Sequence, residues 1–367
     1  MRLLQIDTGR RWRGGQRQCA LLCRNLAADG AEVHLACRHG SPLSQHFAGT
    51  PVRLHGLRAA GELNPVAALR VAGWIRRIRP ELIAAHDTHA LGLAILARSL
   101  GGVRLPLVYH RRIDTPLGGG VLSGWKRRAP ALFICVSHAV AAAVARAGVA
   151  PERIRVVHSG VPPIVRVPEA TASVRAELGV ERDVPIVGTI GSLVGHKDHA
   201  TLLTAFACLV ARRPGAQLLV AGSGYMEPRL REQAAAFSIG PSVHLLGERR
   251  DTDRLLSAMD VFVLPSRTEG LGSSILDAFS LEVPVVATRA GGVPEMVEDG
   301  VTGRLAEVGQ PEALAAAIAQ ALEDPAASRG MALEARARFL AHFTDQAMTA
   351  QTAACYRELL AADPADG

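Results

Sequence analysis

Short apolar runs alternate with helical patterns along most of the chain, and this alternation is the strongest constraint on its fold. Strand and helix in alternation predict a parallel sheet with right-handed crossovers. The strands expected in the first half are residues 3–6, 32–37, 82–85, 107–110 and 132–137. The expected helices are residues 16–28, 65–78, 91–100 and 139–146, with Gly30 and Gly148 where left-handed C-terminal caps belong. The first half therefore reads as an α/β, doubly wound domain.

The alternation stops near Ser159-Gly160-Val161-Pro162-Pro163, and a stretch rich in proline, valine and charge runs from there to Pro185. We interpret this stretch as an interdomain linker. The pattern then restarts with strands at 186–190, 217–221, 243–246, 261–264 and 285–287, and helices at 200–211, 225–237, 253–259 and 273–280. Two helical segments follow, residues 311–322 and 332–360, the second with a break near Phe343-Thr344-Asp345.

These patterns predict three parts of the chain: a first domain over 1–165, a second over 184–345, and a C-terminal helix over 346–367 that returns to the first domain. A length of 367 residues suits two domains of ordinary size. Ligands of open parallel sheets bind outside the carboxyl ends of the strands, so two such domains facing each other are expected to form a cleft.

The composition is that of a globular protein, with 49% hydrophobic and 20% charged residues. No uncharged apolar run reaches the roughly 18 residues of a membrane-spanning helix, and the first residues do not resemble a secretory leader, so we expect a cytoplasmic protein. The six cysteines are scattered and read as reduced core residues. Cys19 and Cys23 have helical spacing, but no second pair accompanies them as a zinc site requires, and packing is favoured.

Charge is distributed unevenly between the two halves. Residues 1–160 hold 23 basic and 8 acidic side chains, whereas residues 161–367 hold 18 basic and 26 acidic ones. The basic half favours an anionic partner, which could be nucleic acid, an acidic membrane surface or a phosphorylated acceptor. A generally arginine-rich composition is the plainer alternative. Nucleic acid is disfavoured, because aromatic residues make up only 4% of the chain and no reading helix is recognisable.

The most informative segment runs from Val261 to Asp277, where a strand, a glycine-bearing loop and a helix follow one another. Backbone N–H groups of Gly272, Ser273 and Ser274, with the positive end of the helix dipole, are suited to a phosphate. Glu269 precedes this anion site and Asp277 follows it, and carboxylates accept hydroxyl hydrogen bonds from sugars. A solvated loop acid at Glu269 and a helix-dipole partner at Asp277 are the structural alternatives.

A second loop, Gly191 to His199, also follows an expected strand and carries Lys197. A lysine there can reach the same cleft and act as a point charge on a diphosphate. An exposed loop lysine without a role is the alternative when this loop is taken alone.

Together these segments resemble the retaining, nucleotide-sugar-dependent glycosyltransferases of the GT-B fold, family 4 (glycosyl transferases group 1). The resemblance covers nearly the whole chain and is most specific from Pro265 to Gly303. A Pro-Ser-x-x-Glu-Gly-x-Gly run is followed by Pro-Val-Val-Ala, Gly-Gly-x-x-Glu and Asp-Gly-x-x-Gly, here Pro284–Ala287, Gly291, Gly292, Glu295, Asp299, Gly300 and Gly303.

The resemblance implies roles for particular residues. It assigns catalysis to His110, Lys197 and Glu269: His110 and Glu269 contact the donor sugar and Lys197 the diphosphate. Asp277 corresponds to the acid that binds the nucleotide ribose. The implied donor-binding residues are Gly15, Ser192, Lys197, Glu269, Leu271, Gly272, Ser273 and Asp277.

In the first half, Trp12-Arg13-Gly14-Gly15-Gln16 resembles the family's glycine loop, and Gly14, Arg111 and Arg112 are candidate acceptor contacts. A plain turn is the alternative for the glycines, and a structural role is the alternative for His110. His86-Asp87-Thr88-His89 resembles a His-x-x-His run that faces the cleft. We favour acceptor contacts or a structural role for it over a metal site.

Two positions depart from the family pattern. Asp277 stands where a glutamate is commoner, which moves the carboxylate back by one methylene. Ser192 stands where many members carry an arginine, so one positive charge is missing unless Arg249, Arg250 or Arg267 compensates.

The resemblance implies a metal-independent transfer with retention, without a further cofactor, from a nucleotide-diphosphate sugar, with UDP-sugars first. The expected acceptor is a saccharide on a lipopolysaccharide core or another lipid-linked glycan. The basic first half, with Arg111-Arg112 and with Lys126-Arg127-Arg128 after a glycine-rich loop, fits a phosphorylated lipid-linked saccharide. Peripheral attachment to the anionic inner face of the cytoplasmic membrane is also expected. The competing functions are a GT-B sugar-nucleotide epimerase and a nucleic-acid-binding protein.

Overall fold

The computed structural model describes residues 1–47, 49–58, 64–114 and 121–362. The glycine-rich loop before Lys126 and the last five residues of the expected C-terminal helix lie outside these ranges. The chain divides into two compact units. The N-terminal unit comprises residues 1–161 together with the chain from Asp345 onward, and the C-terminal unit comprises Pro162–Thr344.

Within its described residues, the N-terminal unit contains a seven-stranded parallel sheet in the order β3-β2-β1-β4-β5-β6-β7. Its strands are β1 (Arg2–Asp7), β2 (Glu32–Arg38), β3 (Arg53–Leu57), β4 (Leu82–Ala85), β5 (Leu107–Arg111), β6 (Leu132–Cys135) and β7 (Ile154–Val156). Its helices are α1 (Gly14–Ala28), α2 (Pro42–His46), α3 (Pro65–Ile78), α4 (Thr88–Gly101), α5 (Val121–Arg128), α6 (His138–Arg146) and α15 (Asp345–Ala362), with a 3₁₀ turn η1 (Pro151–Arg153).

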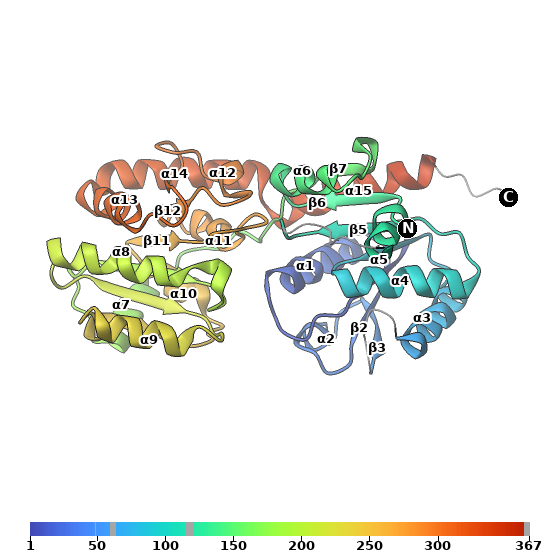
Figure 1. Ribbon diagram of the computed structural model, residues 1–367, viewed down its shortest axis with the longest axis horizontal. Helices are drawn as coiled ribbons and strands as arrows, with labels where there is room; N and C mark the ends of the chain where they lie inside the picture. Colours follow the sequence, from blue (N-terminus) through green and yellow to red (C-terminus); the bar gives the residue numbers. More distant parts are fainter. Residues whose placement is uncertain (48, 59–63, 115–120, 363–367) are drawn as a thin grey trace. The chain divides into compact units, whose positions relative to one another are not determined.

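Helices α1 and α15 cover one face of this sheet, and their apolar side chains share a core with β1, β2 and β4 to β6 (Figure 1). Helix α4 contacts β1, β4 and β5, with α3 packed against it. Cys19 and Cys23, one turn apart on α1, are free thiols buried in the core beneath the helix. Their place agrees with the packing interpretation.

The C-terminal unit contains, in its described residues, a six-stranded parallel sheet in the order β10-β9-β8-β11-β12-β13. Its strands are β8 (Ile186–Ile190), β9 (Gln217–Ala221), β10 (Val243–Leu245), β11 (Val261–Leu264), β12 (Val285–Thr288) and β13 (Arg304–Ala306). Its helices are α7 (Pro168–Leu178), α8 (His199–Arg212), α9 (Glu227–Ala236), α10 (Thr252–Ser257), α11 (Ser274–Ser280), α12 (Val293–Met296), α13 (Pro311–Glu323) and α14 (Pro325–His342), with 3₁₀ turns η2 (Gly195–Lys197) and η3 (Gly240–Ser242).

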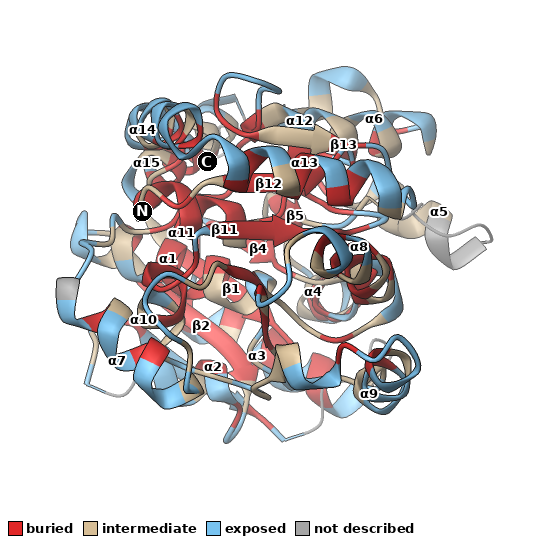
Figure 2. Ribbon diagram, turned by 90° about the vertical axis from the view of Figure 1, so that its left-hand side faces the viewer, coloured by how far each residue is buried: buried red, intermediate tan, exposed pale blue. Residues whose placement is uncertain are grey.

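Apolar residues of α8, α9 and α13 form one core with the strands, while α11 contacts β11 and β12 from the sheet's other face. Figure 2 shows the central strands of both units, such as β4, β5 and β11, as buried. The two doubly wound α/β architectures confirm the predicted fold class. The helical segment expected over 332–360 belongs to α14 and α15, which are separated at Phe343 and Thr344, where the break was predicted, and α14 begins seven residues earlier than expected, at Pro325.

The expected linker contains a helix that the sequence analysis did not predict. Helix α7 occupies residues 168–178 of that stretch and packs against α10. Its ends carry ordinary signals, because a proline stands at its first position and Gly179, with φ of 65°, follows its last. Only the residues on either side of α7 are irregular.

Candidate functional site

Each sheet has a point at which the strand order reverses, and this switch point determines where a ligand can bind. In the C-terminal unit the chain runs outward from β8 to β10 on one side, then returns to start β11 on the other side of β8. The loops after β8 and β11 therefore leave the same edge of the sheet, side by side. Such crevices are the usual ligand sites of open α/β sheets. Lys197 lies in the loop after β8 and Glu269 in the loop after β11.

The structure brings these two predicted residues into direct contact. Lys197 Nζ donates to Glu269 Oε1 in an ion pair. The Glu269 side chain is only 8% exposed, whereas that of Lys197 is 21% exposed. Ser266 Oγ donates to the same carboxylate oxygen at 2.7 Å. A buried carboxylate needs such partners, because removing the charge from water without them is costly.

The backbone around Glu269 is fixed by a close approach of a second segment. Gly291, after β12, has φ of 52°, and a Cβ built there lies 1.9 Å from the carbonyl oxygen of Glu269. The neighbouring Gly292 N–H donates to that carbonyl at 3.2 Å. A glycine is therefore required at position 291 for two reasons: a Cβ atom has no room there, and the backbone adopts a left-handed conformation.

The predicted anion site at the start of α11 has the expected backbone. Gly272 adopts φ of 90°, and the helix begins at Ser274, one residue later than predicted. Gly272 is buried, as is Leu271 before it. Among the described residues, none accepts a hydrogen bond from the backbone N–H of Gly272, Ser273 or Ser274. Ser273 and Ser274 are half-buried. A buried N–H such as that of Gly272 is almost always paired, so these donors are available to an acceptor from outside the chain.

Asp277 lies in the first turn of α11 and is 6% exposed. Ser192 lies just after β8, where its carbonyl oxygen accepts from the N–H of Val194 at 2.9 Å. Both residues thus stand on the two segments that carry Glu269 and Lys197.

A second ion pair, which the sequence analysis did not identify, joins the same two loops. Arg267 Nε donates to Asp198 Oδ2 at 2.7 Å, and the Arg267 N–H donates to the carbonyl of His196 at 2.8 Å. Thr201 Oγ1 also donates to Asp198, at 2.7 Å. Arg267 therefore stands next to the lysine loop, although its side chain is engaged with Asp198. No local pattern indicates this pair, because its members are 69 positions apart.

The other two candidates for the missing positive charge are placed differently. Arg249 donates to the carboxylates of Glu177 and Asp251, and these bonds hold it at the end of α7 and the start of α10. Arg250 is exposed. Of the three arginines, Arg267 is the one that contacts the lysine loop.

In the N-terminal unit the equivalent switch point lies between β1 and β4. Helix α1 begins at Gly14, and a Cβ built on Gly15 meets nothing within 4 Å. The backbone there is open to a ligand. Asp87 connects the two loops of the switch point, since it accepts from Thr8 N at 2.6 Å and caps α4.

Asp7, at the end of β1, accepts from Gly9 N at 2.8 Å and from Gln16 Nε2 at 3.2 Å. Burial, followed by the negative charge of Asp87, raises the pKa of Asp7 to about 6.

His110, the predicted catalytic histidine, is the next-to-last residue of β5 and is 5% exposed. Its Nε2 lies 2.6 Å from Tyr356 Oη of α15, and its ring stacks on that of His86 at 4.6 Å. Burial, followed by the charge of Arg112, lowers the pKa of His110 well below its usual value. Burial also lowers the pKa of His86, with smaller contributions from His110 and Arg112. Both rings are therefore neutral at pH 7.

The predicted acceptor arginines differ in burial. Arg111 is 3% exposed and its Nη1 donates to Tyr109 Oη at 3.2 Å. Arg112 is half-buried and donates to the backbone oxygen and to Nδ1 of His86. His86 thus belongs to a side-chain network, and Asp87 to a helix cap.

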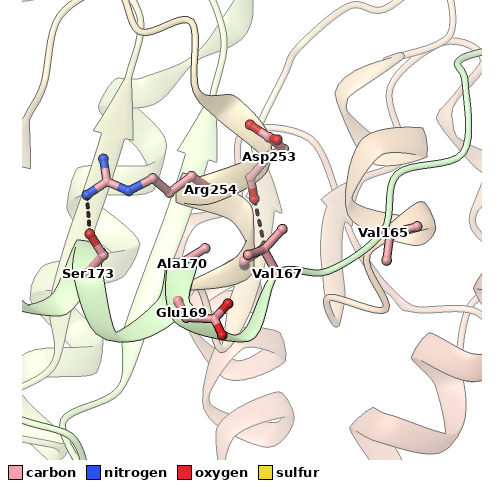
Figure 3. Close-up of a pocket in the computed structure, with 8 residues that line it drawn as sticks. Val165, Val167, Glu169, Ala170, Ser173, Asp253 and Arg254 are labelled. Atoms are coloured by element: carbon pink, nitrogen blue, oxygen red, sulfur yellow. Dashed lines mark hydrogen bonds between the residues drawn. The ribbon is translucent and has the colours of Figure 1, made fainter.

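A pocket of about 280 Å³ lies elsewhere in the C-terminal unit, on α7, α10 and the chain before α7 (Figure 3). Arg254 lines it and donates to Ser173 Oγ at 2.8 Å. Its lining residues are Val165, Val167, Glu169, Ala170, Ser173, Asp253, Arg254 and Ser257, none of them a predicted site residue. No helix in the described part of the chain has the length and apolar character that a membrane crossing requires.

Comparison with known proteins gives a consistent result for both halves. The family model for glycosyl transferases group 1 matches residues 171–338, and the model for Glycosyltransferase Family 4 matches residues 12–164. The lipopolysaccharide core biosynthesis glycosyltransferase LpsE of Rhizobium meliloti (strain 1021) is 28% identical over 96% of each chain. Alpha-maltose-1-phosphate synthase of Mycolicibacterium smegmatis is 32% identical over 67% of this chain and 69% of that protein.

Solved structures agree on the fold. The crystal structure of Anabaena HepE in complex with UDP-glucose matches with a TM-score of 0.87 at 24% identity, covering 98% of this chain and all of that one. WaaG, a glycosyltransferase involved in lipopolysaccharide biosynthesis, matches with a TM-score of 0.74 at 17% identity over 97% of this chain and 99% of that one. The chain therefore belongs to the group 1 glycosyltransferases and has their GT-B fold.

Proposed function

We propose that this glycosyltransferase moves a sugar from a nucleotide-diphosphate sugar to a saccharide acceptor, with Lys197 and Glu269 as its central donor-binding residues. The observation that carries the proposal is their ion pair at the switch point of the C-terminal unit. An ammonium group has three donors, of which the pair uses one. Two donors of Lys197 are left for phosphate oxygens, and the Glu269 carboxylate keeps acceptor capacity for sugar hydroxyls.

The proposed mechanism places the diphosphate against the unpaired N–H groups of Gly272, Ser273 and Ser274, with Lys197 beside it. Charge that develops on the leaving diphosphate is then stabilised by donors already in place. The acceptor hydroxyl attacks the same face of the sugar, the anomeric configuration is retained, and the departing phosphate takes the acceptor proton. His110 donates to the donor sugar, and Asp277 binds the ribose.

A UDP-sugar is the proposed donor, which the UDP-glucose complex of HepE supports. No metal ion is required in this proposal, because Lys197 and backbone N–H groups supply the positive charge. The proposed acceptor is a lipopolysaccharide core or other lipid-linked glycan, in keeping with LpsE over 96% of the chain. The basic first half supports peripheral attachment to the anionic inner face of the cytoplasmic membrane.

A donor screen tests this proposal. The thermal unfolding midpoint is measured with UDP-, GDP- and ADP-sugars in the presence of EDTA, and one nucleotide class is expected to raise it. Release of the nucleoside diphosphate is then measured with and without a deacylated lipopolysaccharide core, and the anomeric proton coupling of the product reports retention. Conversion of the donor to an isomeric nucleotide sugar, without an acceptor and without net release of nucleoside diphosphate, contradicts transfer and favours epimerisation. A protein that no nucleotide sugar stabilises contradicts the donor site itself.

Membrane attachment is tested separately, by sedimentation with vesicles of neutral and of anionic lipid at low and high salt. Retention by anionic vesicles at low salt, lost at high salt, is expected because the attraction is electrostatic. Equal recovery in the supernatant with both lipids contradicts peripheral attachment but leaves the donor site untouched.

A further inference from the structure

Four buried polar side chains of the N-terminal unit meet behind the carboxyl end of its sheet. Gln5 lies on β1, His86 follows β4, His110 lies on β5 and Tyr356 lies on α15, and none of them is more than 5% exposed. Their separations in sequence are long, with 246 positions between His110 and Tyr356. The hydrogen bonds among them determine which ring nitrogens carry protons.

The proton on His86 can be assigned from its partners. Arg112 Nη2 lies 3.0 Å from His86 Nδ1, and a guanidinium can only donate. Nδ1 is therefore the acceptor, so a neutral His86 carries its proton on Nε2. That nitrogen lies 2.6 Å from Gln5 Oε1, a carbonyl oxygen that accepts it. The hydrogen bond of Gln5 Oε1 is thus made to His86, and the Nε2 group of Gln5 is a donor only.

The same reasoning extends to Tyr356. Its hydroxyl is fully buried, and His110 Nε2 lies 2.6 Å from it, while Gln5 interacts with the phenol oxygen as a donor. Gln5 Nε2 makes no hydrogen bond of normal geometry within the described chain. Because an amide NH₂ group can only donate, it cannot accept the phenolic proton. Burial raises the pKa of Tyr356 well above its usual value, so the phenol keeps its proton. The hydroxyl therefore donates to His110 Nε2.

The alternative arrangement, in which His110 Nε2–H donates to the phenol oxygen, leaves a buried O–H without an acceptor. The penalty for such an orphaned donor corresponds to a preference of about tenfold or more for the first arrangement. With Nε2 as acceptor, the proton of the neutral His110 ring resides on Nδ1.

The helix that carries Tyr356 is fixed where it joins this unit. Asp345, its first residue, donates its N–H to Val161 O at 3.1 Å and accepts from Asn25 Nδ2 at 2.9 Å. Further along α15, Met348, Ala353 and Tyr356 pack into the core that α1 covers. The position of the hydroxyl is thus set by the packing of α15 on α1.

We propose that Tyr356 is a positioning residue that holds His110 in its Nδ1–H tautomer, so that α15 determines the hydrogen-bond donor which His110 offers. The proposal rests on the function proposed above, in which His110 donates to the donor sugar. It adds a role for the C-terminal helix α15. This helix supplies no residue to the switch-point loops of either sheet, yet it controls the tautomer of His110 on β5.

The tautomer is measured directly by long-range ¹H–¹⁵N NMR of imidazole-labelled protein, with the His110 signals assigned by their loss in His110→Asn. The wild-type ring is expected to show an acceptor-type Nε2 and a protonated Nδ1 at neutral pH. Tyr356→Phe removes the donor and is expected to shift the ring toward the Nε2–H form. The matched control is Tyr109→Phe. It deletes a buried tyrosine hydroxyl on β5, the strand that carries His110, and should leave the His110 tautomer unchanged.

Kinetics provide the second readout. Tyr356→Phe is expected to lower kcat/KM for transfer by about twofold, because loss of a roughly tenfold tautomer preference leaves about half of the His110 rings in the Nδ1–H form. His110→Asn keeps an N–H donor near the Nδ1 position that no tautomer can remove, so Tyr356→Phe should have no further effect in that background. Equal effects of Tyr356→Phe in both backgrounds indicate a purely structural role and overturn the proposal.

The outcomes separate this inference from the proposed function. A wild-type spectrum with the proton on Nε2 overturns the inference whatever the activity. A protein with the proton on Nδ1 that transfers sugar from no nucleotide donor contradicts the proposed function and the role of His110 in it, while the tautomer assignment stands. If Tyr356→Phe does not fold, the wild-type spectrum alone still decides the assignment.

Discussion

At the switch point of the C-terminal unit, a lysine and a glutamate from neighbouring loops form an ion pair, with Ser266 as a third partner. Near the corresponding point of the N-terminal unit, neutral rings and amides form a buried network that includes His86, His110 and Tyr356. The first arrangement suits a highly charged ligand. When such a ligand binds, Lys197 can contact its phosphate oxygens and Glu269 its hydroxyl groups. The second suits precise orientation, because the rings of His86 and His110 are each held by a buried hydrogen-bond partner.

The comparison is tested most strongly by removing the carboxylate of the ion pair. Glu269→Ala is expected to lower kcat/KM for glycosyl transfer by about 10²–10³-fold, since a preorganised contact to the reacting sugar is lost. Glu227→Gln is the control, because Glu227 forms an exposed pair with Arg231 on α9. Activity is measured as acceptor-dependent release of nucleoside diphosphate. Equal activity of both variants contradicts a role for the ion pair.

The backbone that supports Glu269 is expected to tolerate no side chain at position 291. Gly291→Ala combines a clash with the Glu269 carbonyl and a strained φ, and we expect a loss of about 2–4 kcal/mol in unfolding free energy. All three tryptophans, Trp12, Trp74 and Trp125, belong to the N-terminal unit. Far-UV circular dichroism should therefore show an earlier transition while the tryptophan fluorescence transition stays in place.

Gly300→Ala is the matched control for that variant. Gly300 also has a positive φ, of 76°, but nothing lies within 4 Å of its Cβ position. Strain without a clash is expected to cost about 1 kcal/mol. Equal losses in the two variants contradict the argument that the close approach to Glu269 matters.

In the N-terminal unit, Asp7 is expected to make stability depend on pH. Its pKa is raised from 3.8 to about 6, so the folded protein binds the proton more tightly than the unfolded chain. The stability that this provides is complete below pH ~4 and is lost as the pH rises to about 6, by at most about 3 kcal/mol. Urea unfolding followed by tryptophan fluorescence at pH 4.5 and 7.5 should show this loss in wild type and a smaller one in Asp7→Asn. The same pH dependence in both proteins counts against Asp7 as its source.

The smallest expected effect concerns the second ion pair of the C-terminal unit. Arg267 is 60% exposed and its partner Asp198 is 3% exposed. Arg267→Ala is expected to weaken donor binding by up to about fivefold, since ion pairs of this kind contribute about 0.2–1 kcal/mol. Titration calorimetry with the donor measures the change. A loss as large as that of Lys197→Ala would make Arg267 a direct diphosphate ligand, in place of the arginine missing at Ser192.

Much of the fold was predictable from sequence because the central strands are uniformly apolar. Strands β4, β8, β9 and β11 have the predicted bounds. The missed strands β3, β7 and β13 are short or half-exposed, so they carry little apolar signal. Helix α7 was missed because its apolar periodicity is weak, although its proline and glycine ends were visible.

The candidate site was predictable where a motif is local and not where it depends on packing. Lys197 and Glu269 could be identified because each follows an apolar strand in a recognisable loop, and strand order brings them together. Tyr356 sits in a helix of ordinary composition, and its bond to His110 depends on how α15 packs on α1. No pattern in the sequence predicts that contact.

The central claim is that Lys197 binds the diphosphate and Glu269 binds the sugar, and calorimetry with the donor and with its nucleoside diphosphate tests it most directly. Lys197→Ala should weaken both ligands. Glu269→Ala should weaken the donor alone and leave the nucleoside diphosphate bound at least as tightly, because Lys197 is released from its partner. Equal weakening of both ligands by Glu269→Ala, or no change in either with Lys197→Ala, would contradict the account.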